Sequence, residues 1–223
     1  MKSKAGIFPT LACADYLDLR NQIDIMDRAK VASYHIDIMD GNFVPNYCLN
    51  FDYLKAVSSY TDTPCDVHLM TGEVERDIRT SLECGAAAVA FHSERTDLDI
   101  PALLRMIKSG GAKAGLVLSP HQDVHELEPW LGMTDYVIMM GVKPGFAGQR
   151  FIDDTLDRVR TLSSLRLDKG FPFRILVDGG ISFENAAKCV SAGADDLVAG
   201  ALCIFSKDGG LEENIDRFSA CLE

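Results

Sequence analysis

The sequence lacks the features of several large classes of protein. No apolar stretch among its 223 residues approaches the roughly 20 residues that a transmembrane helix needs. Basic residues are in the minority, with 22 Lys and Arg against 33 Asp and Glu, so a basic nucleic-acid-binding surface is not expected. The first residues reach Pro9, Cys13 and Asp15 before an apolar run of signal-peptide length forms. We therefore expect a soluble protein with neither a membrane nor a nucleic-acid partner.

Paired cysteines and linker segments are missing as well. Seven cysteines are scattered along the chain without a C-x-x-C pair, a pattern that indicates reduced, mostly buried thiols and a cytoplasmic location. Proline and glycine are spread among the loops instead of being concentrated in one low-complexity stretch. Hydrophobic residues make up 47% and charged residues 25%, which is typical of a globular protein. We predict one domain over residues 1–223.

One structural unit recurs along the chain: a short apolar run rich in β-branched residues, a turn, and an amphipathic stretch. The runs expected to form strands are Gly6–Leu11, Ser33–Met39, Cys65–Met70, Ala87–His92, Ala114–Leu118, Tyr136–Met140, Arg174–Val177 and Asp196–Ala199. The stretches expected to form helices are Asp15–Ala29, Phe51–Ser58, Glu73–Cys84, Ile100–Ser109, Val124–Leu131, Ile152–Leu167, Phe183–Ser191 and Leu211–Leu222. The spacing of roughly 25–30 residues suits β-α-β crossovers.

About eight such units predict a parallel sheet. In a chain of this length they favour a single (β/α)8 TIM barrel over an open doubly wound sheet. An open sheet would more often carry a G-x-G-x-x-G turn after its first strand, and the turn at Phe8–Cys13 contains no glycine. The reactive groups of a TIM barrel lie at the C-terminal ends of its strands, so functional side chains are expected there.

The second expected strand places an imidazole and a carboxylate on one face. Because side chains alternate along a strand, His35, Asp37 and Met39 lie opposite Ile36 and Ile38. The isoleucines suit packing against outer helices, which leaves the polar groups inside the barrel. A buried His–Asp hydrogen bond is the structural alternative. A ligand role is favoured because an unpaired buried carboxylate is costly and the pattern recurs.

The third expected strand repeats this pattern, with Asp66, His68 and Met70 alternating with Val67 and Leu69. Two imidazoles and a carboxylate facing one interior suit Zn²⁺, Mn²⁺, Fe²⁺ or Co²⁺ better than Mg²⁺ or Ca²⁺. Asp66 is either a partner that orients a histidine or a structural group at the lower end of the strand.

Two glycine-containing loops complete the candidate site. Asp178 ends the seventh expected strand and precedes Gly179 and Gly180, whose N–H groups and following helix N-terminus form an anion site if the segment is not simply a tight turn. Phosphate sites in TIM barrels often use the loops after strands seven and eight, and Gly200 ends the eighth. Residues 141–149 form a further glycine-rich loop, either a lid, a phosphate contact or an ordinary connection.

Four segments together resemble the ribulose-phosphate 3-epimerase family. They are residues 35–46 (HIDIMDGNFVPN), 66–70 (DVHLM), 144–151 (PGFAGQRF) and 177–181 (VDGGI), and they occur in order across nearly the whole chain. The resemblance implies a TIM barrel that inverts the C3 hydroxyl of a ketose phosphate, most directly D-ribulose 5-phosphate. It also implies a homo-oligomer.

The resemblance implies roles for individual residues. The implied ligands of one divalent metal ion per subunit (Zn²⁺, Fe²⁺, Mn²⁺ or Co²⁺) are His35, Asp37, His68 and Asp178. Asp37 and Asp178 would be the acid/base pair, which must act on opposite faces of C3. The implied substrate contacts are Thr10, Met39, Met70, Met140 (or Met139), Gly145, Phe146, Gly148, Gly179, Gly180, Gly200 and Ala201.

Several positions depart from the family pattern. Thr10 stands where the family usually has Ser, Ser119 where Asn is common, and Ala201 where Ser or Thr commonly helps to bind phosphate. Differences after the Val-Pro-Asn segment are Tyr47, Cys48 and Asn50. The departures leave another ketose phosphate, such as D-allulose 6-phosphate, as an alternative substrate.

Two other functional classes compete with an epimerase. A decarboxylase or isomerase barrel with a catalytic lysine is disfavoured because the expected interior positions supply no lysine. A non-catalytic sugar-phosphate sensor would not need all four metal-site residues. Among the other histidines, His92 either touches the substrate or is a satisfied histidine of the barrel rim, and His121 and His125 are expected in solvent.

Overall fold

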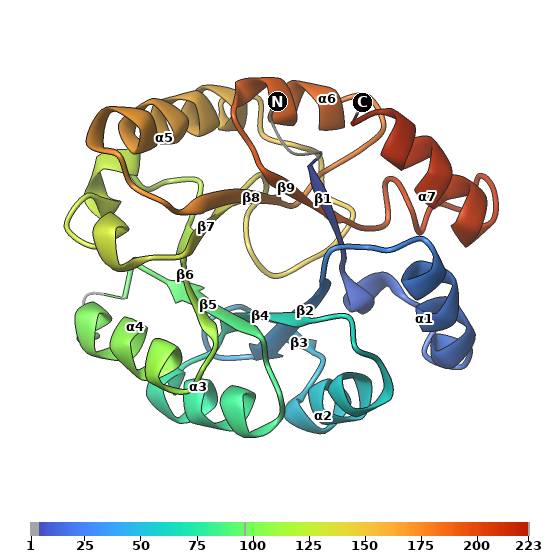
Figure 1. The fold of residues 1–223 in the computed structure, drawn as a ribbon, viewed down its shortest axis with the longest axis horizontal. Coiled ribbons are helices and arrows are strands. Elements are labelled where there is room, and N and C mark those ends of the chain that lie inside the picture. The colour runs from blue at the N-terminus through green and yellow to red at the C-terminus, as the bar shows by residue number, and fades with distance from the viewer. Residues whose placement is uncertain (1–4, 96, 223) are drawn as a thin grey trace.

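The computed structural model describes residues 5–95 and 97–222. Within these ranges nine strands form one sheet in the order β1-β9-β8-β7-β6-β5-β4-β2-β3, and every neighbouring pair is parallel except β2 and β3 (Figure 1). The strands are β1 (Gly6–Pro9), β2 (Tyr34–Asp40), β3 (Tyr47–Cys48), β4 (Cys65–Met70), β5 (Ala88–His92), β6 (Lys113–Leu118), β7 (Tyr136–Met140), β8 (Arg174–Asp178) and β9 (Asp196–Ala199).

The helices surround this sheet on its outer side (Figure 1). The α-helices are α1 (Leu19–Arg28), α2 (Phe51–Tyr60), α3 (Val74–Glu83), α4 (Ile100–Ser109), α5 (Thr155–Lys169), α6 (Ala186–Ala192) and α7 (Leu211–Ala220). Short 3₁₀ segments are η1 (Leu11–Cys13), η2 (Val124–Leu127) and η3 (Leu131–Met133). None of the helices in the described ranges is long and apolar enough to cross a bilayer.

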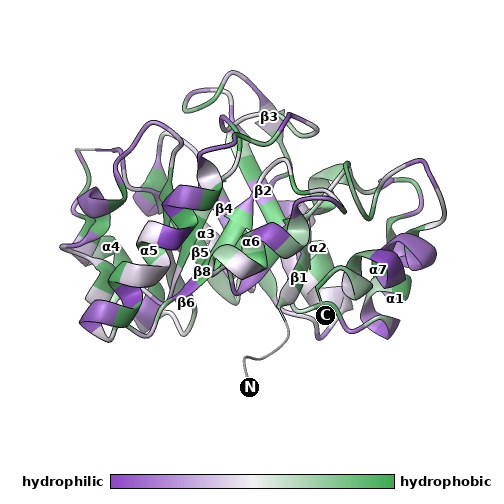
Figure 2. Ribbon diagram, turned by 90° about the horizontal axis from the view of Figure 1, so that it is seen from above, coloured by the Kyte–Doolittle hydropathy of each residue, from purple (hydrophilic) through white to green (hydrophobic). Residues whose placement is uncertain are grey.

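The parallel sheet closes on itself where β1 meets β2. An isolated parallel bridge pairs Thr10 with His35, and the Ala32 N–H donates to the Ile7 carbonyl at 2.9 Å. The strand order and this closure confirm the predicted TIM barrel. The short strand β3 pairs antiparallel with the end of β2, and Figure 2 shows it above the barrel, on the side away from the N-terminus.

Strand alternation separates two apolar layers. The outward side chains of the strands, such as Ile36 and Val67, pack with the apolar faces of the helices in one large cluster. A smaller cluster fills the barrel interior: Ala90, Val117, Tyr136, Ile138, Met140, Val142, Leu176 and Val198. As predicted, Ile36 and Ile38 belong to the outer layer, which leaves His35 and Asp37 on the inner face of β2.

The expected helix over Val124–Leu131 is wrong, because this stretch forms the two short segments η2 and η3. Asp123 and Glu126 make a capping box at the start of η2. Pro129 follows one turn later, and a proline inside an α-helix removes a hydrogen bond and clashes with the preceding turn. The helix therefore stops after a single turn.

All seven cysteines are free thiols in the structure. Three are buried and four are partly exposed, so the expectation of mostly buried thiols is met only in part. They fill space in the outer layer or line the pocket described below.

Gly115 on β6 has no room for a side chain, which generates a prediction about stability. A Cβ atom at this position would lie 2.5 Å from the Tyr136 ring and 2.8 Å from the Ala90 Cβ. Overpacking of this kind costs about 1–3 kcal/mol, so Gly115→Ala should lower the free energy of unfolding by that amount in urea denaturation. Gly132→Ala is the matched control, because its Cβ would come no nearer than 3.5 Å to the Phe171 ring. Equal stabilities of the two variants would contradict the tight packing.

Candidate active site

The four side chains predicted as metal ligands meet at the carboxyl end of the barrel. His35 and Asp37 lie on β2, His68 on β4 and Asp178 at the end of β8. One possible ligand atom from each residue lies within 4.8 Å of all the others, and all four residues are buried. We call these residues the His–Asp cluster.

The imidazole nitrogens that face the carboxylates have no hydrogen-bond partner. His35 Nε2 lies 3.4 Å from Asp37 Oδ1 and 3.7 Å from Asp178 Oδ2. His68 Nδ1 lies 3.5 and 3.4 Å from the same two oxygens. Both nitrogens are buried and unpartnered. Two orphaned nitrogens and two carboxylate oxygens directed at one point are a donor set that fits a divalent transition metal.

The electrostatics of the cluster lower the pKa of both carboxyl groups. Burial alone would raise the pKa of Asp37, but the charge and proximity of His35 and His68 outweigh burial and lower it. The pKa of Asp178 is lowered in the same way. Burial works in the opposite direction on the imidazoles, yet the neighbouring carboxylates raise the pKa of His35 and of His68.

Asp66 orients His35, which decides between the alternatives left open for this residue. Its Oδ2 lies 2.8 Å from His35 Nδ1, and its Oδ1 accepts a hydrogen bond from the Tyr136 hydroxyl at 2.5 Å. Burial and the charge of Asp66 raise the pKa of Tyr136, so the hydroxyl stays a donor. Because Nδ1 is occupied by Asp66, Nε2 of His35 is the nitrogen that faces the cluster.

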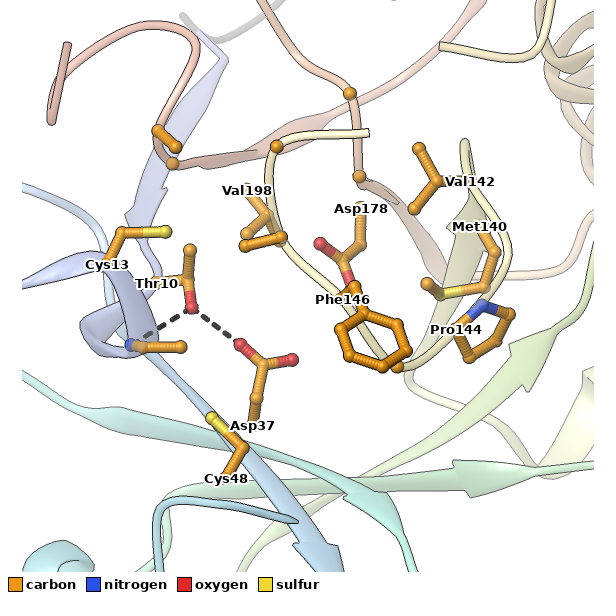
Figure 3. Close-up of a pocket in the computed structure, with 18 of the residues that line it drawn as sticks. Thr10, Cys13, Asp37, Cys48, Met140, Val142, Pro144, Phe146, Asp178 and Val198 are labelled. Carbon is orange, nitrogen blue, oxygen red and sulfur yellow. Dashed lines mark hydrogen bonds between the residues drawn. The ribbon is translucent and has the colours of Figure 1, made fainter. Parts of the chain in front are cut away.

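Thr10 holds the other oxygen of Asp37. The Thr10 hydroxyl donates to Asp37 Oδ2 at 2.5 Å and accepts from the Ala12 N–H at 3.3 Å (Figure 3). Its methyl group lies beside Gly200, where a Cβ would approach it to 3.2 Å. The predicted substrate contact is therefore on the pocket wall, with its hydroxyl engaged by the protein.

A pocket of about 190 Å³ opens over the two carboxylates. Figure 3 shows Asp37 and Asp178 entering it from different strands, with Phe146 and Met140 beside Asp178. The structure brings all of the predicted substrate contacts to its wall: Thr10, Met39, Met70, Met140, Gly145, Phe146, Gly148, Gly179, Gly180, Gly200 and Ala201. Met139 instead faces the outer layer, which leaves Met140 as the methionine at this position.

The loop after β8 requires glycine. Gly179 and Gly180 have φ angles of +99° and +70°, which favour glycine. A Cβ at Gly180 would lie 2.7 Å from the Phe151 Cα, and one at Gly179 would lie 2.4 Å from the Val142 side chain. The helix expected from Phe183 begins only at Ala186, so the backbone beside the pocket belongs to the loop itself.

Several pocket residues are not among the substrate contacts that the sequence predicted. Cys13 lies in η1 and Cys48 in β3, and burial together with the charge of Asp37 raises the pKa of each thiol to about 11. Asn46 lines the pocket and donates from its amide to the Gly145 carbonyl at 2.7 Å, which ties the loop after β2 to the loop after β7. Its place in the 35–46 segment was the only signal.

The remaining histidines lie outside the pocket wall. His92 is buried, with its Nε2 at 3.0 Å from His68 Nε2, and burial lowers its pKa to about 4. His121 and His125 are exposed, as predicted, next to Glu94 and Glu128 respectively.

Comparison with known proteins agrees with this site. The family model described as "Ribulose-phosphate 3 epimerase family" matches residues 6–205. The chain belongs to this family. Its members are isomerases that act on carbohydrates.

Similar proteins include the chloroplastic ribulose-5-phosphate-3-epimerase of Arabidopsis thaliana, 37% identical over 93% of this chain and 74% of that protein. The ribulose-phosphate 3-epimerase of Bacillus subtilis is 37% identical over 87% of this chain and 90% of the relative. That of Escherichia coli K12 is 36% identical, with 87% of each chain covered.

Solved structures of lower identity support the same fold for this epimerase-family chain. A 3-hexulose-6-phosphate synthase aligns with a TM-score of 0.73 at 13% identity, over 98% of this chain and 100% of the other. A tryptophan synthase α-subunit from Pyrococcus furiosus aligns with a TM-score of 0.70 at 14% identity, over 100% and 99% of the two chains. These likenesses concern the fold alone.

The Thr10–Asp37 contact predicts unequal effects of two substitutions. Thr10→Val preserves the shape of the side chain but removes the hydroxyl, so the buried carboxylate loses a hydrogen bond worth about 1.5–3 kcal/mol. Thr10→Ser keeps the hydroxyl and loses one methyl group, which costs about 1 kcal/mol. Urea denaturation in the presence of a chelator should therefore show the larger loss for Thr10→Val. Equal losses would mean that the hydroxyl does not support Asp37.

Proposed function

We propose that the protein interconverts the two C3 epimers of a ketose phosphate, most directly D-ribulose 5-phosphate and D-xylulose 5-phosphate. The observation that carries this proposal is the placement of Asp37 and Asp178 at one pocket, on different strands and above two buried imidazoles. Membership of the epimerase family and the names of the relatives support the substrate.

Epimerisation beside a carbonyl requires two proton carriers on opposite faces of C3. In the proposed reaction one of the two aspartates, Asp37 or Asp178, is ionised and accepts the C3 proton, and the other starts protonated and returns its proton to the opposite face of C3. Their roles exchange in the reverse direction. Proton transfer by a positioned group contributes about 10²–10⁴-fold to the rate. Thr10 holds Asp37 in place by binding its Oδ2.

We propose one divalent metal ion per subunit, held by the His–Asp cluster. The nitrogen ligands would be His35 Nε2 and His68 Nδ1, the two orphaned atoms of the cluster. When bound, such an ion supplies Lewis-acid stabilisation of the negative charge that develops on the substrate oxygens as the proton leaves C3. Zn²⁺, Fe²⁺, Mn²⁺ and Co²⁺ all suit this donor set.

The rest of the pocket would bind and shield the sugar phosphate. Met39, Met70 and Met140 provide an adaptable apolar wall that limits the access of water to the reacting carbons. The phosphate would be bound at the wall formed by Gly148, Gly179, Gly180, Gly200 and Ala201. Because Ala201 has no hydroxyl, backbone N–H groups would carry more of this contact.

The proposal also includes the cellular location and the oligomeric state of the enzyme. The scattered free thiols support a cytoplasmic protein. A homo-oligomer is part of the proposal because the family resemblance implies one.

Solvent deuterium tests the reaction and the acid/base assignment together. The wild type in D₂O should convert D-ribulose 5-phosphate to D-xylulose 5-phosphate and place deuterium at C3, as measured by NMR. Asp178→Asn removes one proton carrier, so exchange should slow by about 10²–10⁴-fold. Asp153→Asn, at an exposed position, should exchange at the wild-type rate.

The outcomes of that experiment separate the alternatives. Near wild-type exchange in Asp178→Asn would remove the proposed role of Asp178. Faster turnover of D-allulose 6-phosphate in a panel of pentulose and hexulose phosphates would reassign the substrate. Binding of sugar phosphates without exchange of any of them would identify a non-catalytic sensor.

Metal analysis tests the ligand set. His68→Ala removes one of two nitrogen ligands, so Zn²⁺ binding should weaken by more than the roughly 10–100-fold that loss of an outer partner costs. Stoichiometry after dialysis and chelator competition provide the measurement. His125→Ala removes an exposed histidine and should leave the affinity unchanged. An unchanged affinity in His68→Ala would remove His68 from the ligand set.

A further inference from the structure

A chain of buried polar contacts leads from His68 away from the pocket. His68 Nε2 lies 3.0 Å from His92 Nε2, and His92 Nδ1 lies 3.1 Å from Ser119 Oγ. Ser119 in turn donates to Glu94 Oε1 at 3.0 Å. These residues come from β4, the end of β5 and the residues that follow β5 and β6. They therefore connect three neighbouring strands at the carboxyl end of the barrel.

Each imidazole ring and each hydroxyl has one hydrogen to donate, and this determines which group is the donor in each contact. His68 Nδ1 faces Asp37 and Asp178, and it must carry a lone pair to bind a cation, so the ring hydrogen is on Nε2. His92 Nε2 then accepts this hydrogen, which places the hydrogen of His92 on Nδ1. Ser119 accepts from His92 and passes its hydroxyl hydrogen to the Glu94 carboxylate, which is an acceptor only.

We propose that His92, Ser119 and Glu94 are positioning residues that hold His68 in the tautomer whose Nδ1 lone pair faces the two catalytic aspartates. This inference rests on the metal site of the proposed function. His92 acts through His68, because its own ring belongs to the barrel wall and not to the residues described as lining the pocket. The two histidine ligands are thus supported differently. The carboxylate of Asp66 supports His35 directly, whereas His68 is supported through the ring of His92, whose Nδ1 lies 3.1 Å from Ser119 Oγ and 3.5 Å from Glu94 Oε1.

These hydrogen-bonded residues are buried, so water does not readily take their place as partners of His68. His68 and Ser119 are almost completely inaccessible, and His92 is 2% exposed. The His68 and His92 rings stack with centroids 5.1 Å apart, and Phe43 packs against His92 with centroids 4.6 Å apart. A lost partner in this layer is not readily replaced by water, so its loss leaves a buried donor or acceptor unsatisfied.

Glu94 anchors the outer end. Its Oε2 lies 2.7 Å from Nε2 of the exposed His121, and its side chain is 21% exposed. An ionised carboxylate at this end can only accept hydrogen bonds, which orients every donor behind it in one direction. Ser119 relays this orientation to His92 through its hydroxyl oxygen.

A pair of substitutions at His92 tests the inference through metal affinity. His92→Phe keeps an aromatic ring against Phe43 but removes the acceptor for His68 Nε2, so the Zn²⁺ dissociation constant should rise about 10–100-fold in chelator competition. His92→Gln restores an acceptor oxygen and should recover most of the affinity. His125→Phe makes the same change at an exposed position and should match the wild type. Circular dichroism checks that each variant is folded.

A measurement on the unaltered protein gives an independent test. Nitrogen-15 NMR of the histidine rings in the Zn²⁺-loaded wild type should show His68 carrying its hydrogen on Nε2 and His92 carrying its hydrogen on Nδ1. A hydrogen on His92 Nε2 would overturn the inference, even if His92→Phe failed to fold.

The outcomes distinguish this inference from the proposed function. A wild type that binds no Zn²⁺ in stoichiometric amount would overturn both. A wild type that binds Zn²⁺, together with a His92→Phe variant that binds it equally well, would overturn the positioning role alone. Equal losses in His92→Phe and His92→Gln would show that packing, and not the hydrogen bond, supports His68, and this result would also overturn it.

Discussion

The site depends on the attraction between two imidazoles and two carboxylates that are buried together in the barrel. An ionised carboxylate moved alone into the barrel would carry a desolvation penalty of several kcal/mol. Asp37 and Asp178 are tolerated because His35 and His68 face them, and the lowered carboxyl pKa values express the same attraction. The arrangement also leaves two nitrogen atoms unsatisfied, which is why the cluster fits a cation.

The contact between β1 and β2 both closes the barrel and supports the site. The bridge between Thr10 and His35 brings β1 beside β2, and the hydroxyl of Thr10 then reaches Asp37. A sheet left open at this position would leave one oxygen of Asp37 without its partner. The fold therefore contributes to the chemistry by fixing the carboxylate as well as by bringing the strands together.

The sequence predicted the parts of the molecule that depend on local periodicity. Alternation along β2 and β4 determined which side chains enter the barrel, and the recurring strand–helix unit determined the fold. Two features depend on which strands become neighbours: the short hairpin strand that carries Cys48, and the contact of His92 with His68. The residue pattern of a single strand does not reveal its neighbours. The apolar periodicity continues through Pro129, but the proline prevents a continuous helix from Val124.

Gly115 shows how far the demands of the site extend into the fold. It has no functional group, yet its missing side chain makes room for Tyr136, which holds Asp66, which in turn orients His35. A residue here that displaced the tyrosine ring would disturb an imidazole on another strand. The chemistry on β2 thus constrains the sequence of β6, a strand with no residue on the pocket wall.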